Sequence, residues 1–363
     1  MRSGFRKKWD DLNLKLESAY RKHTYKKKAK IRLKRMNGGF KCDKEYKELV
    51  VPFWKQYNYK PAKFWYQIFS DREKKVDPRY IPDDLYYGEI IPYFSNSQFR
   101  RFGEDKCYHD LWIPNIKRPQ TICKNIAGVY YDSNMNPISY ETAVDLAYNY
   151  PDEFLIKPSI DSGEGRLIQF FSPDKTTRKD IEDTFKNMGA NFLLQASIKQ
   201  HPLLAKLNPS SVNTIRVVTF FFEGEVHVLS CILRVGAPNS KVDNVGAGGY
   251  ACPVLVDGRL SDKAVNRKAE WVNRTLEGVQ FSEIQIPEFE NVIRMVKAAH
   301  KKMAHFKLIG WDMSVDINND PIFIEYNTCP GSNQITCGPT FGDLTERVLQ
   351  EFFIDKKLAK AQN

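Results

Sequence analysis

Apolar residues recur at two different spacings along this chain of 363 residues, and each spacing predicts one type of element. Over residues 4–36 they recur every three or four positions, as on one face of a long helix. Between residues 43 and 104 shorter helical patterns are interrupted by prolines, which predicts an irregular, mostly helical region with its many aromatic residues in a core. Further helical patterns begin at Asp105-Lys106 and cover residues 142–148, 180–188, 289–305 and 343–357.

Strand patterns occupy the middle and the later part of the chain. The predicted strands are residues 126–131, 154–158, 167–171, 191–196, 212–222 and 226–235. The last two form a hairpin over Glu223-Gly224-Glu225. Two more short strands flank Asn318-Asn319, a pair that suits the positive φ angles of a two-residue hairpin loop. Helices mixed with hairpin strands predict an α+β fold.

The hairpin around Asn318-Asn319 gathers acidic residues on one face. A two-residue loop places Asp312 directly opposite Glu325. Side chains alternate between faces along a strand, so one face carries Asp312, Ser314, Asp316, Phe323, Glu325 and Asn327, and the other carries Met313, Val315, Ile317, Ile322, Ile324 and Tyr326. Like charges opposite each other repel, so the acidic face is predicted to hold a cation. Oxygen ligands of this kind suit Mg²⁺; the alternative is a solvated face with scattered acids.

The charge of the chain is concentrated at its beginning. The first 36 residues carry 14 Lys and Arg against three acids, which accounts for the whole net charge of +11, so the rest of the chain is neutral. A basic amphipathic segment can lie on anionic lipid, and it can also bind an acidic glycan or nucleic acid, although nucleic acid is not favoured here. The alternative is a helix packed on the body by its stripe of Phe5, Trp9, Leu12, Leu16, Ala19 and Tyr20.

The sequence also indicates a compartment. No run of about 18 apolar residues predicts a transmembrane helix, and the basic N-terminus lacks the apolar region of a signal peptide. The seven cysteines are odd in number and contain no C-x-x-C motif, which favours reduced thiols over disulfides or zinc. We expect a cytoplasmic protein, with residues 1–36 able to hold it at the inner face of a membrane.

Two glycine-containing segments are candidates for close approach to a ligand. The strand at 154–158 ends on Lys157 and is followed by a turn with Gly163 and Gly165, whose backbone N–H groups can reach an anion. This is a phosphate-site candidate. Residues 243–249 form either a mobile lid or a long hairpin connection.

The ordered set of motifs resembles the ATP-grasp fold, and within it the sugar-transfer-associated group, over about residues 100–355. The motifs are F-L-I-K-P at 154–158, N-T-I-R-V-V-T at 213–219, D-N-x-x-A-G-G at 243–249, G-W-D at 310–312 and I-E-Y-N-x-x-P-G at 324–331. The resemblance implies two α+β subdomains that clamp ATP, with an added helical N-terminal region. The expected division is a basic segment at 1–40, an aromatic-rich region at 41–104 and an ATP-grasp domain at 105–363, with subdomains at about 125–195 and 196–355.

The resemblance also implies roles for individual residues. Lys106 and Lys157 would reach the ATP phosphates, with Lys124 as a rival to Lys106. The phosphate-covering loop would be Ser162, Gly163, Glu164 and Gly165, and the hinge that reads adenine would be Gln195, Ala196, Ser197 and Ile198, with Gln195 where an acidic residue is usual. The Mg²⁺ ligands would be Asp312, Glu325 and Asn327, with Glu325 bridging two ions. Arg216 would face an acyl phosphate, assisted by Arg234, and the substrate loop would include Asn213, Asp243, Asn244, Gly248 and Gly249.

The implied activity is ATP-dependent ligation of a carboxylate to an amine through an acyl phosphate. The substrate would be a cell-surface polysaccharide or its sugar precursor, and the amine could be that of an amino acid. One alternative is a kinase that phosphorylates a sugar hydroxyl. Another is a nucleotide-binding module docked on a membrane or a polyanion by its basic N-terminus. No Ser/His/Asp or Cys/His arrangement suggests a different nucleophile.

Overall fold

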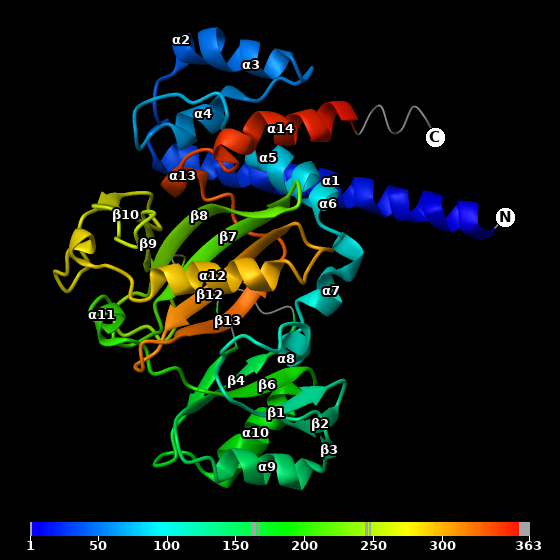
Figure 1. The fold of residues 1–363 in the computed structure, drawn as a ribbon, viewed down its shortest axis with the longest axis vertical. Helices are drawn as coiled ribbons and strands as arrows, with labels where there is room; N and C mark the ends of the chain where they lie inside the picture. Colours follow the sequence, from blue (N-terminus) through cyan, green and yellow to red (C-terminus); the bar gives the residue numbers. More distant parts are fainter. Residues whose placement is uncertain (1, 161–164, 166, 244–245, 247, 356–363) are drawn as a thin grey trace.

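The computed structural model describes residues 2–160, 165, 167–243, 246 and 248–355, which form three regions stacked along the long axis of the molecule (Figure 1). A helical region lies at one end, a seven-stranded sheet in the middle and a six-stranded sheet at the other end. The helices are α1 (Arg2–Arg35), α2 (Asp43–Glu45), α3 (Val51–Lys55), α4 (Lys63–Phe69), α5 (Asp83–Leu85), α6 (Ile91–Phe94), α7 (Arg100–Gly103), α8 (His109–Trp112), α9 (Tyr140–Tyr148), α10 (Arg178–Met188), α11 (Pro202–Ala205), α12 (Phe289–His300), α13 (Gln334–Cys337) and α14 (Thr345–Gln350).

The six-stranded sheet is antiparallel, with the order β3-β2-β1-β6-β4-β5. Its strands are β1 (Thr121–Ile126), β2 (Val129–Asp132), β3 (Pro137–Ile138), β4 (Phe154–Pro158), β5 (Gln169–Phe171) and β6 (Phe192–Ala196). Helices α9 and α10 pack on it through a core that includes Val144, Ile181 and Phe185. The strand predicted at 126–131 is correct for residues 129–131, which lie in β2, but it is not continuous. Ala127 and Gly128 both have positive φ and turn the chain between β1 and β2.

The seven-stranded sheet has the order β11-β10-β9-β8-β7-β12-β13. Its strands are β7 (Thr214–Phe222), β8 (Glu225–Val235), β9 (Tyr250–Pro253), β10 (Ala264–Asn266), β11 (Trp271–Val272), β12 (Leu308–Val315) and β13 (Pro321–Asn327). Helix α12 crosses one face of this sheet (Figure 1), and Val292 and Val296 of α12 join a core with Trp311 and Met313 of β12. Every residue of β12 is buried, because β12 lies between β7 and β13 and is covered on both faces.

The helical region shares one core with the C-terminal helix. Most of the predicted core aromatics of residues 43–104 are buried, although Phe99 and Phe102 are exposed. The buried ones pack with residues of β7, α14 and their neighbours; the shared cluster includes Trp54, Tyr66, Tyr86, Phe94, Phe220, Phe222, Phe341, Leu349 and Phe352. Phe94 contacts Phe220 edge to face, with 5.1 Å between the ring centroids. The N-terminal helical region is therefore built onto the seven-stranded sheet.

Helix α1 confirms the helical pattern predicted over residues 4–36, but it packs on the body only through its later half. Tyr25 stacks on Tyr87 with 3.8 Å between the ring centroids, and Ala29 is buried. The earlier half extends away from the body (Figure 1). Leu16 is 60% exposed and Tyr20 is 72% exposed, so the expected alternative in which this stripe packs on the body is wrong. Among the described residues, no helix combines the length and the apolar content needed to cross a bilayer.

Candidate active site

The hairpin of β12 and β13 places Asp312 opposite Glu325, as predicted. The predicted two-residue loop is wrong. The N–H of Asp316 donates to the carbonyl of Asp320 at 3.0 Å, and Asn319 has a φ of +65°, whereas Asn318 does not have a positive φ. Three residues, 317–319, therefore make the turn.

A bulge at Ile324 restores the register that the longer loop would otherwise shift. Beyond the Asp312–Glu325 pair, the next pair along the hairpin is Met313 with Phe323, so Ile324 has no opposite residue. Phe323 therefore lies on the core face, with 6.1 Å between its ring centroid and that of Trp311. Ile322 pairs with Ser314 and so lies on the opposite face from Met313. The predicted faces of Ile322, Phe323 and Ile324 are wrong for this reason.

Asp312 is buried and its carboxylate is held by two arginines. Arg216 lies opposite Asp312 on the neighbouring strand β7 and bonds both of its oxygens, through Nε and through Nη2, the latter at 2.8 Å. Arg234 donates from Nη2 to Asp312 Oδ2 at 2.9 Å. Burial alone would raise the pKa of Asp312, but the two guanidinium groups outweigh it and lower the pKa. Both arginines that the sequence nominated therefore converge on a predicted metal ligand.

The acidic face is smaller than the sequence predicted. Asp316 does not join it, because its carboxylate pairs with Lys117 at 2.7 Å and accepts two N–H groups of the hairpin turn. Within the described part of the chain, no group of three or more His, Cys, Asp or Glu side chains could hold a metal ion. The remaining donors are the oxygens of Asp312, Glu325 and Asn327. They fit Mg²⁺ of the kind held by one or two carboxylates and completed by substrate phosphates.

Two lysines from separate segments meet at Glu325. Lys106 Nζ lies 3.4 Å from Glu325 Oε2, and the N–H of Lys106 donates to the carbonyl of Ser159, just beyond β4. Lys157 is buried at the end of β4, and burial lowers its pKa to about 8, with Glu325 opposing that shift and Lys106 adding to it. A cluster of charged side chains therefore lies where the two sheets meet.

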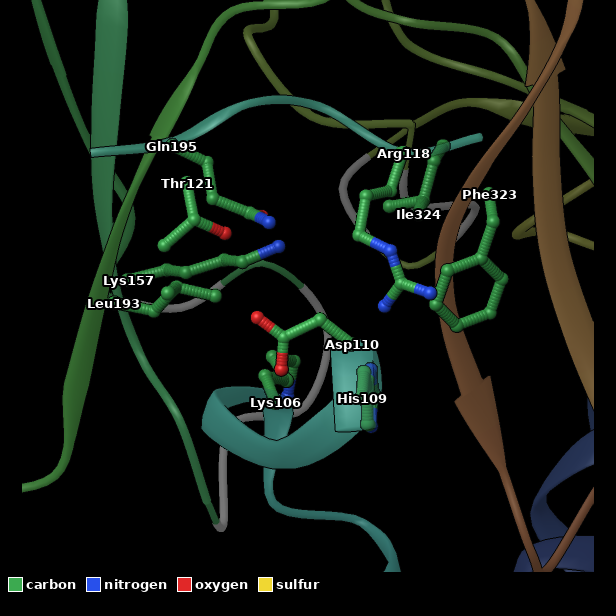
Figure 2. A pocket seen from close by; sticks show the side chains of 10 residues that line it. All are labelled: Lys106, His109, Asp110, Arg118, Thr121, Lys157, Leu193, Gln195, Phe323 and Ile324. Carbon is green, nitrogen blue, oxygen red and sulfur yellow. The ribbon is translucent and has the colours of Figure 1, made fainter. Parts of the chain in front are cut away.

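These lysines face a narrow pocket between the two sheets (Figure 2). Its volume is about 10 Å³, roughly room for one water molecule. Figure 2 shows Lys157, Thr121 and Gln195 approaching from the six-stranded sheet and Arg118 approaching from the side of Phe323. The space at this point is therefore too small for a whole nucleotide.

Buried polar atoms without a protein partner gather around this pocket. In the described structure they include Asp110 Oδ1, Arg118 Nη1, His109 Nε2 and Gln195 Oε1. A buried polar atom left unpaired carries a free-energy penalty of about 1–3 kcal/mol. Four such atoms around one cavity indicate a site that a polar ligand completes.

The pocket includes some of the nominated nucleotide residues and not others. Of the proposed hinge, Gln195 lines the pocket, whereas the N–H groups of Ala196 and Ser197 donate to the carbonyls of Gln120 and Glu153, both at 2.9 Å. Ile198 follows this segment and is not among the lining residues. The rival lysine, Lys124, is buried and pairs with Asp110 at 2.6 Å.

The proposed phosphate-covering loop is described only at Gly165; Ser162, Gly163 and Glu164 lie outside the described residues. Gly165 has a φ of +70°, and a Cβ there would lie 2.7 Å from Val242 Cγ1. Gly165 itself therefore lies close to the segment that leads to Asp243.

The nominated substrate-loop residues fall into two groups. Asp243 pairs with Arg234 at 3.2 Å, which joins it to the Asp312 cluster. Asn213 is buried, and its amide donates to the carbonyls of Leu204 and Asn208, so it orders the preceding loop. Asn244 lies outside the described residues, while Gly248, with a φ of +108°, and the buried Gly249 lead into β9.

Sequence reasoning missed several residues of the site. His109 and Asp110 lie three and four residues after Lys106, a helical spacing that could have indicated a shared face. Arg118 lies in a proline-flanked loop and gave no such signal. Glu104 accepts from the N–H of Thr328 at 2.8 Å and from its hydroxyl at 2.7 Å, and so ties the segment before Lys106 to the end of β13.

Comparison with known proteins gives one family match. The family described as sugar-transfer associated ATP-grasp matches residues 116–348, more than half of the chain. No curated protein matches the sequence.

Several solved structures are similar to this chain. D-alanyl-alanine synthetase A from Vibrio cholerae has a TM-score of 0.41 at 10% identity, over 70% of this chain and 65% of that one. D-alanine–D-alanine ligase from Helicobacter pylori has a TM-score of 0.37 at 15% identity, over 69% and 61%. The corresponding ligase from Bacillus anthracis has a TM-score of 0.39 at 14% identity, over 73% and 72%. This chain thus spans less than two thirds of the length of the Vibrio and Helicobacter proteins.

Proposed function

Because this chain belongs to the sugar-transfer associated ATP-grasp family, we propose that it is an ATP-dependent ligase that joins a carboxylate to an amine through an acyl phosphate. The observation that carries the proposal is the convergence of Lys106, Lys157 and Glu325 beside a pocket lined by unpaired polar atoms. Three segments far apart in the sequence supply these groups. The two lysines fit the phosphates of a bound nucleotide, and Glu325 fits the Mg²⁺ that accompanies them.

The chemistry requires each of these parts. A carboxylate is a poor electrophile until its oxygen takes the γ-phosphoryl group of ATP, after which an amine attacks the acyl carbon and phosphate leaves. Phosphoryl transfer depends mainly on positioning and on the neutralisation of charge. Lys106 and Lys157 would neutralise and orient the phosphates. When bound to Asp312, Glu325 and Asn327, Mg²⁺ would supply further neutralisation of the phosphate oxygens.

Arg216 and Arg234 suit the acyl-phosphate side of this reaction. An arginine has five N–H donors, and Arg216 uses two of them to hold Asp312. The remaining donors can bond the negative charge that develops on the transferred group. The pairing with Asp312 fixes the orientation of the guanidinium before the substrate arrives.

We propose a sugar or glycan carboxylate as the acyl substrate, because the family description links its members to sugar transfer. An amino acid would supply the amine. The reaction would take place in the cytoplasm, where ATP is available and the cysteines, all unpaired in the described structure, remain reduced.

The test is an assay that traps the acyl phosphate. The purified protein is incubated with Mg-ATP, a panel of uronic acids and hydroxylamine, which converts an acyl phosphate to a stable hydroxamate. We expect release of ADP that depends on the carboxylate, and hydroxamate in proportion to it. Replacement of hydroxylamine with amino acids should give an amide.

Two other outcomes would overturn the ligase proposal. A stable phosphorylated sugar that forms without an amine and resists hydroxylamine would indicate a kinase acting on a hydroxyl group. Binding of Mg-ATP without turnover, over the whole substrate panel, would indicate a nucleotide-binding module.

A further inference from the structure

Helix α1 carries two different faces, and among the described residues the contacts with the rest of the protein come from one of them. Its inner face packs on the body through Tyr25 and Ala29. On the same side Lys22 pairs with Glu89 at 2.5 Å and Lys26 pairs with Asp84 at 3.2 Å. Charged groups of the inner face are therefore matched by acids of the body.

The outer face begins with an exposed apolar stripe. Trp9 is 56% exposed, Leu12 48%, Leu16 60% and Tyr20 72%. At 100° per residue these four side chains lie within about 80° of one another around the helix, and their centre lies about 140° from Ala29. The stripe therefore faces away from the body as well as extending beyond it (Figure 1).

The same outer face continues as a basic stripe. Lys27, Lys30 and Lys34 are exposed, and by helical geometry they project in the same direction as Trp9, Leu12 and Leu16. From Trp9 to Lys34 the face is about 38 Å long. The apolar half and the basic half of this face both point outward. Packing among the described residues does not explain why.

We propose that the outer face of α1 docks on an anionic lipid surface, with the apolar half entering the headgroup region and the three lysines contacting lipid phosphates or carboxylates. Trp and Tyr side chains favour the boundary between water and lipid, and leucines gain free energy by leaving water. Lysines near an anionic surface add an attraction that falls off within a Debye length, about 8 Å at physiological salt.

The charge of this segment favours a lipid surface over the other partners that could bind this face. A second copy of the chain would bring another α1, and the first 36 residues of each carry 14 basic residues against three acids, so like charges would repel. A soluble polyanion would attract the lysines but would leave Trp9, Leu12 and Leu16 in water. A lipid surface satisfies both halves of the face at once.

The test is co-sedimentation of the full-length protein with vesicles. We expect binding to vesicles of phosphatidylcholine with 30% phosphatidylserine, weaker binding to phosphatidylcholine alone, and a progressive loss of binding as salt is raised from about 50 to 500 mM, where the Debye length falls below about 5 Å.

A matched pair of substitutions tests the apolar half. Leu16→Ser should lower the vesicle partition coefficient about fivefold, since part of a leucine side chain no longer leaves water. Leu14→Ser makes the same change on the opposite side of the same helix, where Leu14 is 42% exposed, and should leave partitioning unchanged.

A second pair tests the basic half. Replacement of Lys27, Lys30 and Lys34 together by Gln should lower partitioning about a hundredfold, at about fivefold for each lysine. Replacement of Lys297 in α12 and of Lys301 and Lys302 just beyond its end by Gln removes the same charge from another exposed surface and should have little effect. ATP turnover of all these variants should match that of the wild type, which separates this proposal from the proposed ligase activity.

Several results would overturn the docking proposal. These are equal binding to neutral and anionic vesicles, no binding to either, or equal effects of Leu16→Ser and Leu14→Ser. A concentration-dependent dimer that Leu16→Ser abolishes would instead assign the face to a second copy of the chain. Salt-dependent binding to a soluble polyanion that is as strong as vesicle binding, and insensitive to Leu16→Ser, would also contradict it.

Discussion

Arg216 bonds both carboxylate oxygens of Asp312 from the adjacent strand, and the two side chains are almost fully withdrawn from solvent. Removal of one partner of such a pair leaves the other as an uncompensated buried charge, whereas removal of both charges is much less damaging. The pair therefore makes a clear prediction about stability.

Arg216→Ala should lower the free energy of unfolding by about 3 kcal/mol, because Asp312 would remain buried with Arg234 as its main counter-charge. Addition of Asp312→Asn to this variant should recover part of the loss. Urea unfolding of the two single variants and the double variant measures the coupling. Simple additivity of the two single effects would show that the pair makes no energetic contribution.

The burial of Lys157 should lower the free energy of unfolding, whereas its charge should support ATP turnover. A fall in pKa from 10.5 to about 8 corresponds to about 3 kcal/mol in favour of the neutral form. Between pH 8 and 10.5 the Lys157 side chain keeps its proton in the unfolded chain but has released it in the folded chain. The contribution of Lys157 to the free energy of unfolding therefore rises with pH in that window.

Lys157→Met should therefore melt at a higher temperature than the wild type at pH 7, and the difference should shrink as the pH approaches 10.5. The same variant should lose about a hundredfold in kcat/KM for ATP, because a phosphate-neutralising charge is lost. Thermal melts across the pH range, together with ATP kinetics, check both parts. A lower melting temperature at pH 7 would show that Lys157 is a structural ion-pair partner instead.

Glu325→Gln should abolish Mg²⁺-dependent ATP turnover, with a fall of at least about a hundredfold, while the melting temperature changes little because Glu325 is only half-buried. The matched variant Asp320→Asn removes a carboxylate from the exposed turn of the same hairpin and should retain normal turnover. The measurement is ATP consumption against Mg²⁺ concentration. Wild-type turnover in Glu325→Gln would remove Glu325 from the proposed metal ligands.

Glu104 should act by positioning Lys106. Its carboxylate holds the backbone and the hydroxyl of Thr328, one residue beyond β13, while Arg100 pairs with it at 3.1 Å. Glu104→Ala should lower kcat/KM for ATP about tenfold and speed hydrogen exchange at the N–H of Thr328. Glu104→Gln, which keeps an acceptor oxygen, should restore most of both. Unaltered exchange at Thr328 would contradict a positioning role.

The order of the sequence motifs was enough to predict the α+β, ATP-grasp fold, which the family match and the two antiparallel sheets confirm. The Asp312–Glu325 pair is also correct, although for an incomplete reason: the loop is one residue longer than predicted, and the bulge at Ile324 compensates. The alternation of hydrophobic and polar residues predicts which face of a strand is buried. It does not reveal a single inserted residue such as a bulge.

The pocket was harder to predict than the hairpin. Asp110 and Arg118 reach it from short helical and loop segments whose direction is set by contacts made far along the chain. Arg118, for example, lies over the ring of Phe323, at 5.6 Å from its centroid. No local pattern in residues 105–120 encodes that contact, so the sequence identified the strand-borne groups of the site and missed the loop-borne ones.

The core shared by the first and last parts of the chain has a consequence for synthesis. Trp54, Tyr66 and Phe94 need partners such as Phe341 and Leu349, which leave the ribosome at least about 250 residues later. At usual elongation rates that delay is roughly 12 to 50 seconds. Throughout it the nascent chain presents a large aromatic surface without its final cover, so this protein is expected to depend on chaperones during translation and to fold only after its C-terminal helix has emerged.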